Sequence, residues 1–325
     1  MNNTKVVFMG TPEFAVPVLD GLIKNYNVVL VVSQADREKD RKGRLLYTPV
    51  KKLALDNNIP VYQPDSIRKE YNKVLEYNPD IIVTCAYGQI IPIELLNYPK
   101  YGCINVHASL LPKLRGGAPI HRALMNGDKE TGITIMYMDE KMDNGDIISQ
   151  EKTSILEDDN LDSLYERLSK MGSQLLLKTL PLILNNKNDR IKQNENEVTY
   201  GYNINREEEK IEFSNKSLDI HNKIRALSTH PGAYCYLDDK RLKIYKTSLT
   251  DTVSDEKPGT IVDITKNGIY VSTSDYIIII KELKLEGKKK CDVRDFVNGI
   301  DIMELKGRIL RWMIIIMKIR KIVIK

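Results

Sequence analysis

The stretch that decides the fold is Cys103-Ile104-Asn105-Val106-His107-Ala108-Ser109-Leu110-Leu111-Pro112-Lys113-Leu114-Arg115-Gly116. It begins as an apolar segment and continues into a turn. Side chains at positions i and i+2 of a strand lie on the same face. Asn105 and His107 are therefore predicted to point the same way, while Ile104 and Val106 pack. A donor amide beside a titratable ring at a strand end suits acyl-transfer chemistry.

Continuous apolar strands alternate with helices on both sides of this stretch. Strands are predicted at 5–9, 27–33, 59–62, 80–85, 102–107 and 131–138, and helices at 13–24, 66–77 and 161–184. This alternation is typical of the α/β class and predicts a Rossmann-like, doubly wound parallel sheet in the N-terminal half. Asp159 or Asn160 is the expected cap of the last helix.

The composition changes after residue 184. Residues 185–199 are polar and poor in apolar side chains, which predicts a solvated linker. A helix is expected at 217–227, and strands at 233–237, 241–246, 259–264, 268–273 and 276–285. Short strands at this spacing predict a C-terminal OB-like β-barrel. The expected division is a domain at 1–184, a linker at 185–206, a β-barrel domain at 207–308 and a tail at 309–325.

The composition is that of a soluble globular protein of 325 residues, with 42% hydrophobic and 29% charged side chains. Four scattered cysteines argue against a disulfide framework or zinc site and fit a reducing compartment. No secretory signal or bilayer-spanning stretch is evident, so no stable membrane association is expected. Residues 201–325 carry 24 basic and 18 acidic residues. This excess permits a polyanionic partner, although it also fits a solvated surface.

A glycine after the first strand raises the question of a dinucleotide site. The turn Gly10-Thr11-Pro12-Glu13-Phe14-Ala15 lacks the second and third glycines of G-x-G-x-x-G, which let the backbone approach a pyrophosphate. Glu13 would also place negative charge where a phosphate sits. The sequence therefore disfavours NAD binding, and a tight strand-to-helix turn is enough to explain Gly10.

A carboxylate follows downstream in Met142-Asp143-Asn144-Gly145-Asp146. Alone, this segment is most simply a turn around Asn-Gly, and it lacks the spaced ligands of a calcium loop. Beside Asn105 and His107 it would add a third group suited to acyl transfer. Asn105 and His107 can donate to an oxyanion, while Asp143 can stabilise a protonated imidazole and help to take an amine proton. His121 is interpreted as a structural or surface residue.

These residues closely resemble the signature of the folate-dependent formyltransferase family. Further stretches resemble the same family in the same order: Val7–Ala15, Ala86–Gly88, Gly117–Ile120, Thr131–Met136 and His230–Ala233. The similarity covers most of residues 5–305. It implies transfer of a formyl group from 10-formyltetrahydrofolate to the free amine of initiator methionyl-tRNA, without a metal. It also implies a monomer that works in a bacterial-type cytoplasm, with an organelle as the alternative compartment.

The resemblance also implies which residues bind the substrates. The residues expected to bind the folate are Ala86, Tyr87, Gly88, Gln89, Ile90, Ser109, Leu110, Leu111 and Pro112. Those expected to receive the methionyl end are Gly10, Thr11 and Pro12, and those expected to grip the tRNA from the basic segment 36–52 are Arg37, Arg41, Lys42 and Arg44. Lys281, Lys284 and Lys288–Lys290 form a second candidate phosphate-binding patch. Either basic cluster could instead be an ordinary charged surface. Ala35 and Leu114 depart from the family pattern.

Two other functions compete with tRNA formylation. A formyltransferase acting on a nucleotide-linked amino sugar would share Asn105, His107 and Asp143, but the basic segment 36–52 favours tRNA. A non-catalytic RNA-binding protein on the same scaffold would not need that intact set. A glycinamide ribonucleotide formyltransferase would usually end near residue 200. The tail 309–325 mixes apolar and basic residues and resembles nothing in the family. The sequence leaves three roles open for this tail: an extension, an added packing element or a membrane contact.

Overall fold

The computed structural model describes residues 2–37, 39, 43, 45–298 and 302–312. The chain divides into two compact units, one formed by residues up to Ala123 together with Asp128–Asn203, and the other by Leu124–Gly127 together with the chain from Ile204 onward. Among the described residues, no helix is long and apolar enough to cross a membrane.

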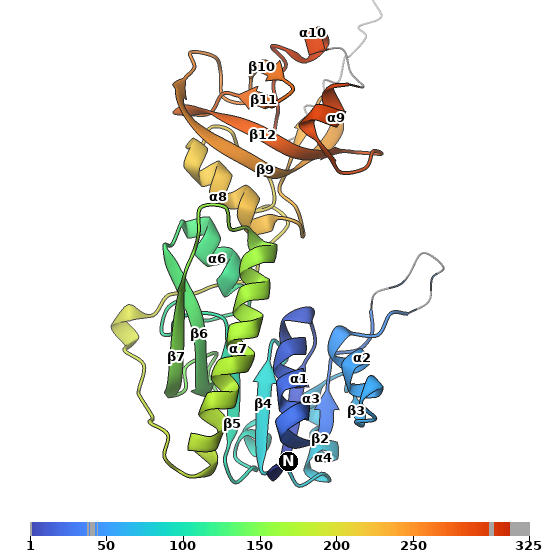
Figure 1. Ribbon diagram of the computed structural model, residues 1–325, viewed down its shortest axis with the longest axis vertical. Helices are drawn as coiled ribbons and strands as arrows, with labels where there is room; N and C mark the ends of the chain where they lie inside the picture. Colours follow the sequence, from blue (N-terminus) through green and yellow to red (C-terminus); the bar gives the residue numbers. More distant parts are fainter. Residues whose placement is uncertain (1, 38, 40–42, 44, 299–301, 313–325) are drawn as a thin grey trace, which may run out of the picture. The chain divides into compact units, whose positions relative to one another are not determined.

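A seven-stranded sheet forms the centre of the first unit, in the order β3-β2-β1-β4-β5-β6-β7 (Figure 1). Its strands are β1 (Asn2–Gly10), β2 (Tyr26–Val32), β3 (Val61–Tyr62), β4 (Ile81–Cys85), β5 (Cys103–His107), β6 (Glu130–Tyr137) and β7 (Ile147–Ser154). The first five pair in parallel, which confirms the predicted α/β fold with a parallel sheet.

The last two strands differ from the prediction, because β6 pairs antiparallel with β5, and β7 antiparallel with β6. The strand expected at 131–138 was placed correctly, but its parallel direction was wrong and β7 was not predicted. The short connection 138–146 has no room for a crossover helix, so it joins a hairpin. Along the outer strand β7, alternate side chains are exposed. This half-buried pattern belongs to an antiparallel edge strand rather than to a continuous apolar strand.

Helices cover the sheet and fix the ends of its strands. They are η1 (Glu13–Ala15), α1 (Val16–Asn25), α2 (Pro49–Asp56), α3 (Ile67–Glu70), α4 (Asn72–Leu75), α5 (Ile93–Leu96), α6 (Pro119–Asn126) and α7 (Leu161–Leu184). The helix expected at 66–77 is two short helices, α3 and α4. The long helix has its predicted bounds, and α1 and α7 lie against each other across one face of the sheet (Figure 1).

The start of α7 is held by a double cap. The Asn160 side chain accepts a hydrogen bond from the Ser163 amide, and the Ser163 hydroxyl accepts one from the Asn160 amide. Just before it, the buried Asp159 carboxylate accepts hydrogen bonds from the Leu156 amide, the Ser163 hydroxyl and the Arg167 guanidinium. Burial alone would raise the pKa of Asp159, but these donors hold its pKa below the ordinary value.

We expect Asp159→Asn to lower the free energy of unfolding at pH 7 by roughly 1.5–3 kcal/mol, the worth of hydrogen bonds to a charged group. Because the folded pKa is lowered, the carboxylate stabilises the fold above its unfolded pKa of about 3.9, and this contribution is lost as the pH falls through the folded pKa. Urea unfolding should therefore show the gap between wild type and variant closing below about pH 4. The exposed neighbour Asp158 provides the control Asp158→Asn. An equal loss in both variants would contradict the assignment.

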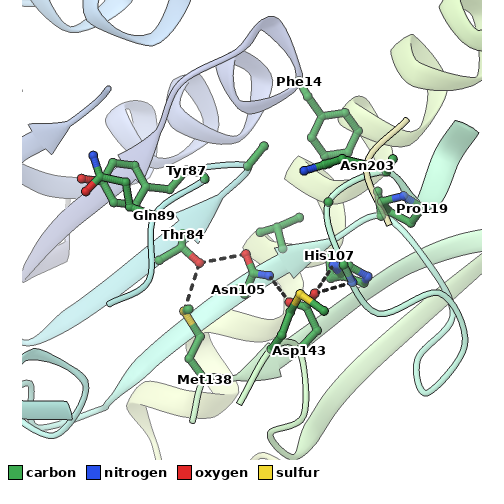
Figure 2. A pocket seen from close by; sticks show the side chains of 18 of the residues that line it. Phe14, Thr84, Tyr87, Gln89, Asn105, His107, Pro119, Met138, Asp143 and Asn203 are labelled. Carbon is green, nitrogen blue, oxygen red and sulfur yellow. Dashed lines mark hydrogen bonds and ion pairs between the residues drawn. The ribbon is translucent and has the colours of Figure 1, made fainter. Parts of the chain in front are cut away.

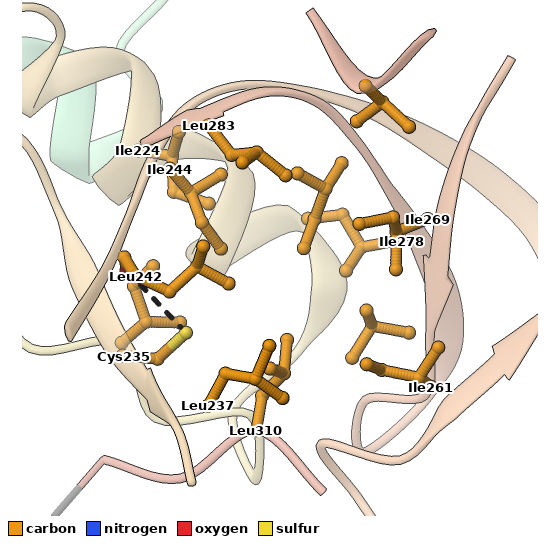
Figure 3. Packing of buried hydrophobic residues seen from close by; sticks show 14 of the residues in the cluster. Ile224, Cys235, Leu237, Leu242, Ile244, Ile261, Ile269, Ile278, Leu283 and Leu310 are labelled. Carbon is orange, nitrogen blue, oxygen red and sulfur yellow. Dashed lines mark hydrogen bonds between the residues drawn. The ribbon is translucent and has the colours of Figure 1, made fainter. Parts of the chain in front are cut away.

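The second unit contains an antiparallel sheet in the order β10-β11-β12-β9-β8, with β13 paired to β12. Its elements are α8 (Ser217–Leu227), β8 (Tyr234–Leu237), β9 (Lys240–Val253), β10 (Ile261–Thr265), β11 (Gly268–Val271), β12 (Tyr276–Leu285), β13 (Cys291–Asp292), α9 (Val293–Val297) and α10 (Ile302–Leu305). One face of the sheet and α8 enclose an aliphatic core (Figure 3). The helix at 217–227 was predicted with its correct bounds.

The OB-like barrel is not confirmed, because β8 and β10, the two ends of the sheet, are not paired with each other in the described chain. Residues 307–311 instead make backbone hydrogen bonds to both ends, from Leu310 to Gly259 and between Arg311 and Tyr236. Leu310 is buried in the core (Figure 3). The beginning of the segment expected as a tail is therefore part of this unit, and residues 313–325 lie outside the described residues.

Candidate active site

Two neighbouring strands of the first unit end at the candidate site. Thr84 in β4 lies opposite Asn105 in β5, and the Thr84 hydroxyl donates a hydrogen bond of 2.8 Å to the Asn105 Oδ1. Because the oxygen is held in this way, the Asn105 amide must direct its NH₂ group the other way. That group donates to the Asp143 Oδ1 at 3.4 Å, and Figure 2 shows this continuous line of contacts.

His107 ends β5 and is almost fully buried. Its Nε2 donates to the Leu114 carbonyl oxygen at 3.0 Å, and its Nδ1 lies 3.7 Å from the Asp143 Oδ2. Both ring nitrogens therefore face oxygen acceptors, and a protonated ring would satisfy both of them. The structure thus brings together the three residues predicted as the catalytic set, although His107 has no N–H directed to an open position in this arrangement.

The Asp143 carboxylate is held by backbone geometry as well as by its neighbours. Asp143 has φ of 50°, a left-handed conformation that aspartate tolerates better than most residues. Its Oδ2 accepts a hydrogen bond of 2.8 Å from the Gly116 amide. Gly116 has φ of 123°, which favours glycine strongly. The turn after Pro112 therefore has a direct role in fixing the carboxylate.

A buried arginine and a distant glutamine hold the loop that carries Asp143. The Gln193 amide group donates to the backbone carbonyls of Asp143 at 2.8 Å and Gly145 at 2.9 Å. Arg115 donates from Nε to the Gln193 Oε1 and from one terminal nitrogen to the Asn144 Oδ1, both at 3.0 Å. Gln193, which belongs to the segment expected as a solvated linker, is therefore hydrogen-bonded to the first unit. Without it, the carbonyls of Asp143 and Gly145 would lose these partners.

Replacing Gln193 with leucine removes these hydrogen bonds while roughly preserving side-chain size. Since the loop then loses two restraints, we expect kcat for the formyl transfer that the sequence resemblance implies to fall about tenfold, the equivalent of one to two hydrogen bonds. The KM for the formyl donor should stay nearly constant, which separates poor positioning of Asp143 from a damaged donor site. The exposed neighbour supplies the control Lys192→Leu. Equal kcat values for Gln193→Leu and this control would contradict the role.

A cavity of about 610 Å³ opens beside these residues, and it falls within the usual size range of small-molecule sites. Asn105, His107 and Asp143 all line it. Of the residues expected to contact substrates, the structure also brings Pro12, Ala86, Tyr87, Gly88, Gln89 and Ile90 to its wall. The site therefore lies at the carboxyl ends of the parallel strands, where open α/β sheets bind ligands.

Other expected residues do not line this cavity. Ser109 is buried, and its hydroxyl donates to the Lys113 carbonyl. Leu111 packs in a small apolar cluster, and Leu110 and Pro112 belong to the turn rather than the wall. Gly10 ends β1 and pairs with Cys85, and the Thr11 hydroxyl donates to the Tyr87 carbonyl; neither residue lines the cavity. These positions can support the site without touching a ligand.

The basic segment 36–52 is described in part. Arg37 is exposed, whereas Arg41, Lys42 and Arg44 lie outside the described residues. Lys51 is not available to a phosphate in this arrangement, because its ammonium group bonds to Asp36 and to the Gln63 side chain. The end of the segment is helical, since α2 begins at Pro49 with the Thr48 hydroxyl as its cap.

Several cavity residues were missed by the sequence interpretation. His121, interpreted from the sequence as a structural or surface residue, lines the cavity, and burial lowers its pKa. Tyr165 of α7 and Phe14 also line it, with the Phe14 amide donating to the Tyr165 hydroxyl, and burial raises the pKa of Tyr165 to about 12. Phe14 belongs to the family-like stretch Val7–Ala15, but no local pattern marks His121 or Tyr165, because these two reach the site only through helix packing. Cys103 is buried in the apolar core away from the cavity.

Two protein-family models and several curated proteins match this chain. Residues 4–180 match the model of the formyl transferase family, and residues 203–301 match that of the formyl transferase C-terminal domain. A methionyl-tRNA formyltransferase of Bacillus cytotoxicus is 51% identical, with 91% of this chain and 95% of the relative covered. That of Malacoplasma penetrans is 44% identical, with 91% and 94% covered.

A solved structure shares the same fold. The N-formyltransferase of Helicobacter canadensis, in complex with folinic acid and dTDP-3-aminofucose, has a TM-score of 0.64 and 25% identity, with 85% of this chain and 98% of that chain covered. The two family matches and the curated relatives together cover most of the chain. The chain therefore belongs to the methionyl-tRNA formyltransferase family.

Proposed function

We propose that this protein transfers the formyl group of 10-formyltetrahydrofolate to the free amine of methionyl-tRNA, which supplies formyl-methionyl-tRNA for translation initiation. The observation that carries the proposal is the meeting of Asn105, His107 and Asp143 at one cavity. The curated relatives support the acceptor, since those compared here are methionyl-tRNA formyltransferases. The bound folinic acid of the Helicobacter canadensis enzyme supports a folate donor.

The geometry suits direct transfer between two bound substrates. Attack of the amine on the formyl carbon places negative charge on the formyl oxygen, and the second N–H of the Asn105 amide is placed to stabilise it. Asp143 accepts the proton that the amine loses, and His107 stabilises the carboxylate through its Nδ1. The new C–N bond forms first and gives a tetrahedral intermediate; when this intermediate collapses, the C–N bond to the folate breaks and the proton passes to the departing folate nitrogen. No covalent enzyme intermediate is needed.

The chain's own residues fit a folate at the strand-end cavity. The loop Ala86–Ile90 combines small side chains with the buried ring of Tyr87, and it leaves Ile90 strongly exposed. Gly88 packs tightly against Gln34, whose amide donates to the Tyr87 carbonyl and so fixes the loop. A flat heterocycle could lie along such a wall, with backbone groups giving specificity. Contacts of Arg37, Arg41, Lys42 and Arg44 with tRNA stay a prediction from the sequence.

The competing acceptor is a nucleotide-linked amino sugar, because the Helicobacter canadensis relative was solved with dTDP-3-aminofucose. The test offers purified protein 10-formyltetrahydrofolate with methionyl-tRNA in one reaction and with dTDP-3-aminofucose in another. We expect formylation of the tRNA alone. Formylation of the sugar alone would overturn the acceptor and keep the catalytic set. Absence of transfer to either would favour a non-catalytic RNA-binding protein.

A further inference from the structure

Two tyrosines stack on each other at the surface of the first unit. The rings of Tyr200 and Tyr202 are 5.2 Å apart between centroids and 4° from parallel. Both remain exposed, at 48% and 58%. The other close aromatic pairs among the described residues meet edge to face. A parallel pair with both rings exposed leaves apolar surface in contact with water, and such exposed apolar surface is typical of a binding surface.

The backbone that carries this pair runs beside residues that line the cavity, although neither ring is itself part of the lining. Residues 199–201 run alongside residues 114–118, with hydrogen bonds from Arg115 to the Thr199 carbonyl, from Gly201 to the Arg115 carbonyl and from Ala118 to the Gly201 carbonyl. Gly116, whose amide holds Asp143, contacts the Gly201 carbonyl so closely that a side chain there would collide with it. The tyrosine segment is therefore separated from the catalytic carboxylate by a single residue.

Alternation along this extended segment explains why both rings face outward. Gly201 is buried against the backbone of Pro119, so its neighbours on either side project to the opposite face. Asn203, the next residue of the inward series, lines the cavity with Pro119 (Figure 2). The Arg122 guanidinium donates to the Tyr202 and Asn203 carbonyls and fixes this part of the rim. The rings are therefore presented from a well-bonded backbone.

We propose that Tyr200 and Tyr202 form a stacking platform for the adenine base at the 3′ end of the methionyl-tRNA. This inference rests on the proposed function. The methionine is joined to the terminal ribose by an ester. When its amine lies at Asn105 and Asp143, the ribose is therefore about one residue's length away, comparable to the ~3.8 Å between successive Cα atoms. In this proposal the terminal base lies just outside the cavity, on the exposed face of the segment that carries the two rings. Aromatic side chains bind nucleic-acid bases there by stacking, with little demand on hydrogen bonding.

The test measures steady-state kinetics of tRNA formylation in Tyr200→Ala, Tyr202→Ala and the double variant. We expect KM for methionyl-tRNA to rise about five- to a hundredfold in the double variant, the range found for loss of base stacking. The value of kcat and the KM for the formyl donor should change little. Tyr200→Phe and Tyr202→Phe should retain most of the affinity, because they keep the rings. Tyr98→Ala, at another exposed tyrosine of the same unit, is the matched control.

The outcomes separate this inference from the proposed function. A wild-type protein that does not formylate methionyl-tRNA would refute the proposed function. An active wild type with unchanged tRNA KM in the double variant would refute the platform alone. A rise confined to the KM for the formyl donor would assign the tyrosine pair to the folate site and would also refute the stacking platform. Circular dichroism and thermal melting of each variant exclude loss of folding, and the Phe variants supply the comparison if an Ala variant is unstable.

Discussion

Replacing Asp143 with asparagine is expected to lower kcat for formyl transfer by about 10²–10⁴-fold, the usual contribution of a positioned acid–base group. Asparagine keeps the size and the left-handed backbone preference of aspartate but cannot accept the amine proton. It also removes the negative charge 3.7 Å from the His107 Nδ1. Single-turnover mixing of protein, formyl donor and methionyl-tRNA measures this step without interference from product release.

The matched control for this change is Asp146→Asn. Asp146 belongs to the same loop but pairs with Arg190 and does not line the cavity. Its variant should transfer formyl groups at nearly the wild-type rate, and both variants should bind methionyl-tRNA with similar affinity. A loss of less than tenfold in Asp143→Asn would contradict the proton-accepting role. An equal loss in Asp146→Asn would show that the damage comes from the loop as a whole.

The catalytic set was predictable from sequence because short-range rules place most of it. Strand alternation puts Asn105 and His107 on one face, and a strand that ends at His107 delivers both to the carboxyl edge of the sheet. Asp143 followed only from the family resemblance. Its place depends on the β6–β7 hairpin, whose antiparallel direction was not predicted. The wrong strand direction did not change this outcome, because β6 ends beside Ile104 and the loop after it still brings Asp143 to the Asn105 side chain.

What the sequence could not supply is contact between distant segments. Arg115 and Gln193 are 78 residues apart, yet they share one hydrogen bond and together hold the Asp143 loop. The polar composition around Gln193 predicted solvent exposure, because composition does not distinguish polar groups that face water from those that satisfy loop carbonyls. His121 and Tyr165 were missed for a similar reason. Helix packing alone turns them toward the cavity.

The same limit explains the second unit. Strand spacing predicted several of its strands well, but barrel closure depends on whether the first and last strands meet, which is a long-range property. Here residues 307–311 bond to both ends of the sheet, and Leu310 completes the core. The apolar residues of the tail, which resemble nothing in the family, therefore have a packing role at least as far as Leu310.

Asn105→Ala is expected to lower kcat by about 10²–10³-fold, the cost of losing one preorganised oxyanion donor. The loss should fall on kcat rather than on the KM values, because the donor acts where charge develops in the transition state. Binding of methionyl-tRNA and of the folate should therefore be nearly unchanged. Rapid-quench measurement of the transfer step, with separate binding measurements for each substrate, distinguishes this result from a general defect in the cavity.

A second substitution tests whether orientation of the Asn105 amide matters as well as its presence. Thr84→Val keeps the shape of the side chain but removes the 2.8 Å hydrogen bond that holds the Asn105 Oδ1. Because the amide can then rotate, we expect an intermediate loss of roughly two- to tenfold, the equivalent of one hydrogen bond. If Asn105 acts as the oxyanion donor, combining both changes should cost no more than Asn105→Ala alone, since Thr84 acts only through that amide. Additive losses would instead give Thr84 an independent role, and a rate for Asn105→Ala within threefold of wild type would remove Asn105 from the catalytic set.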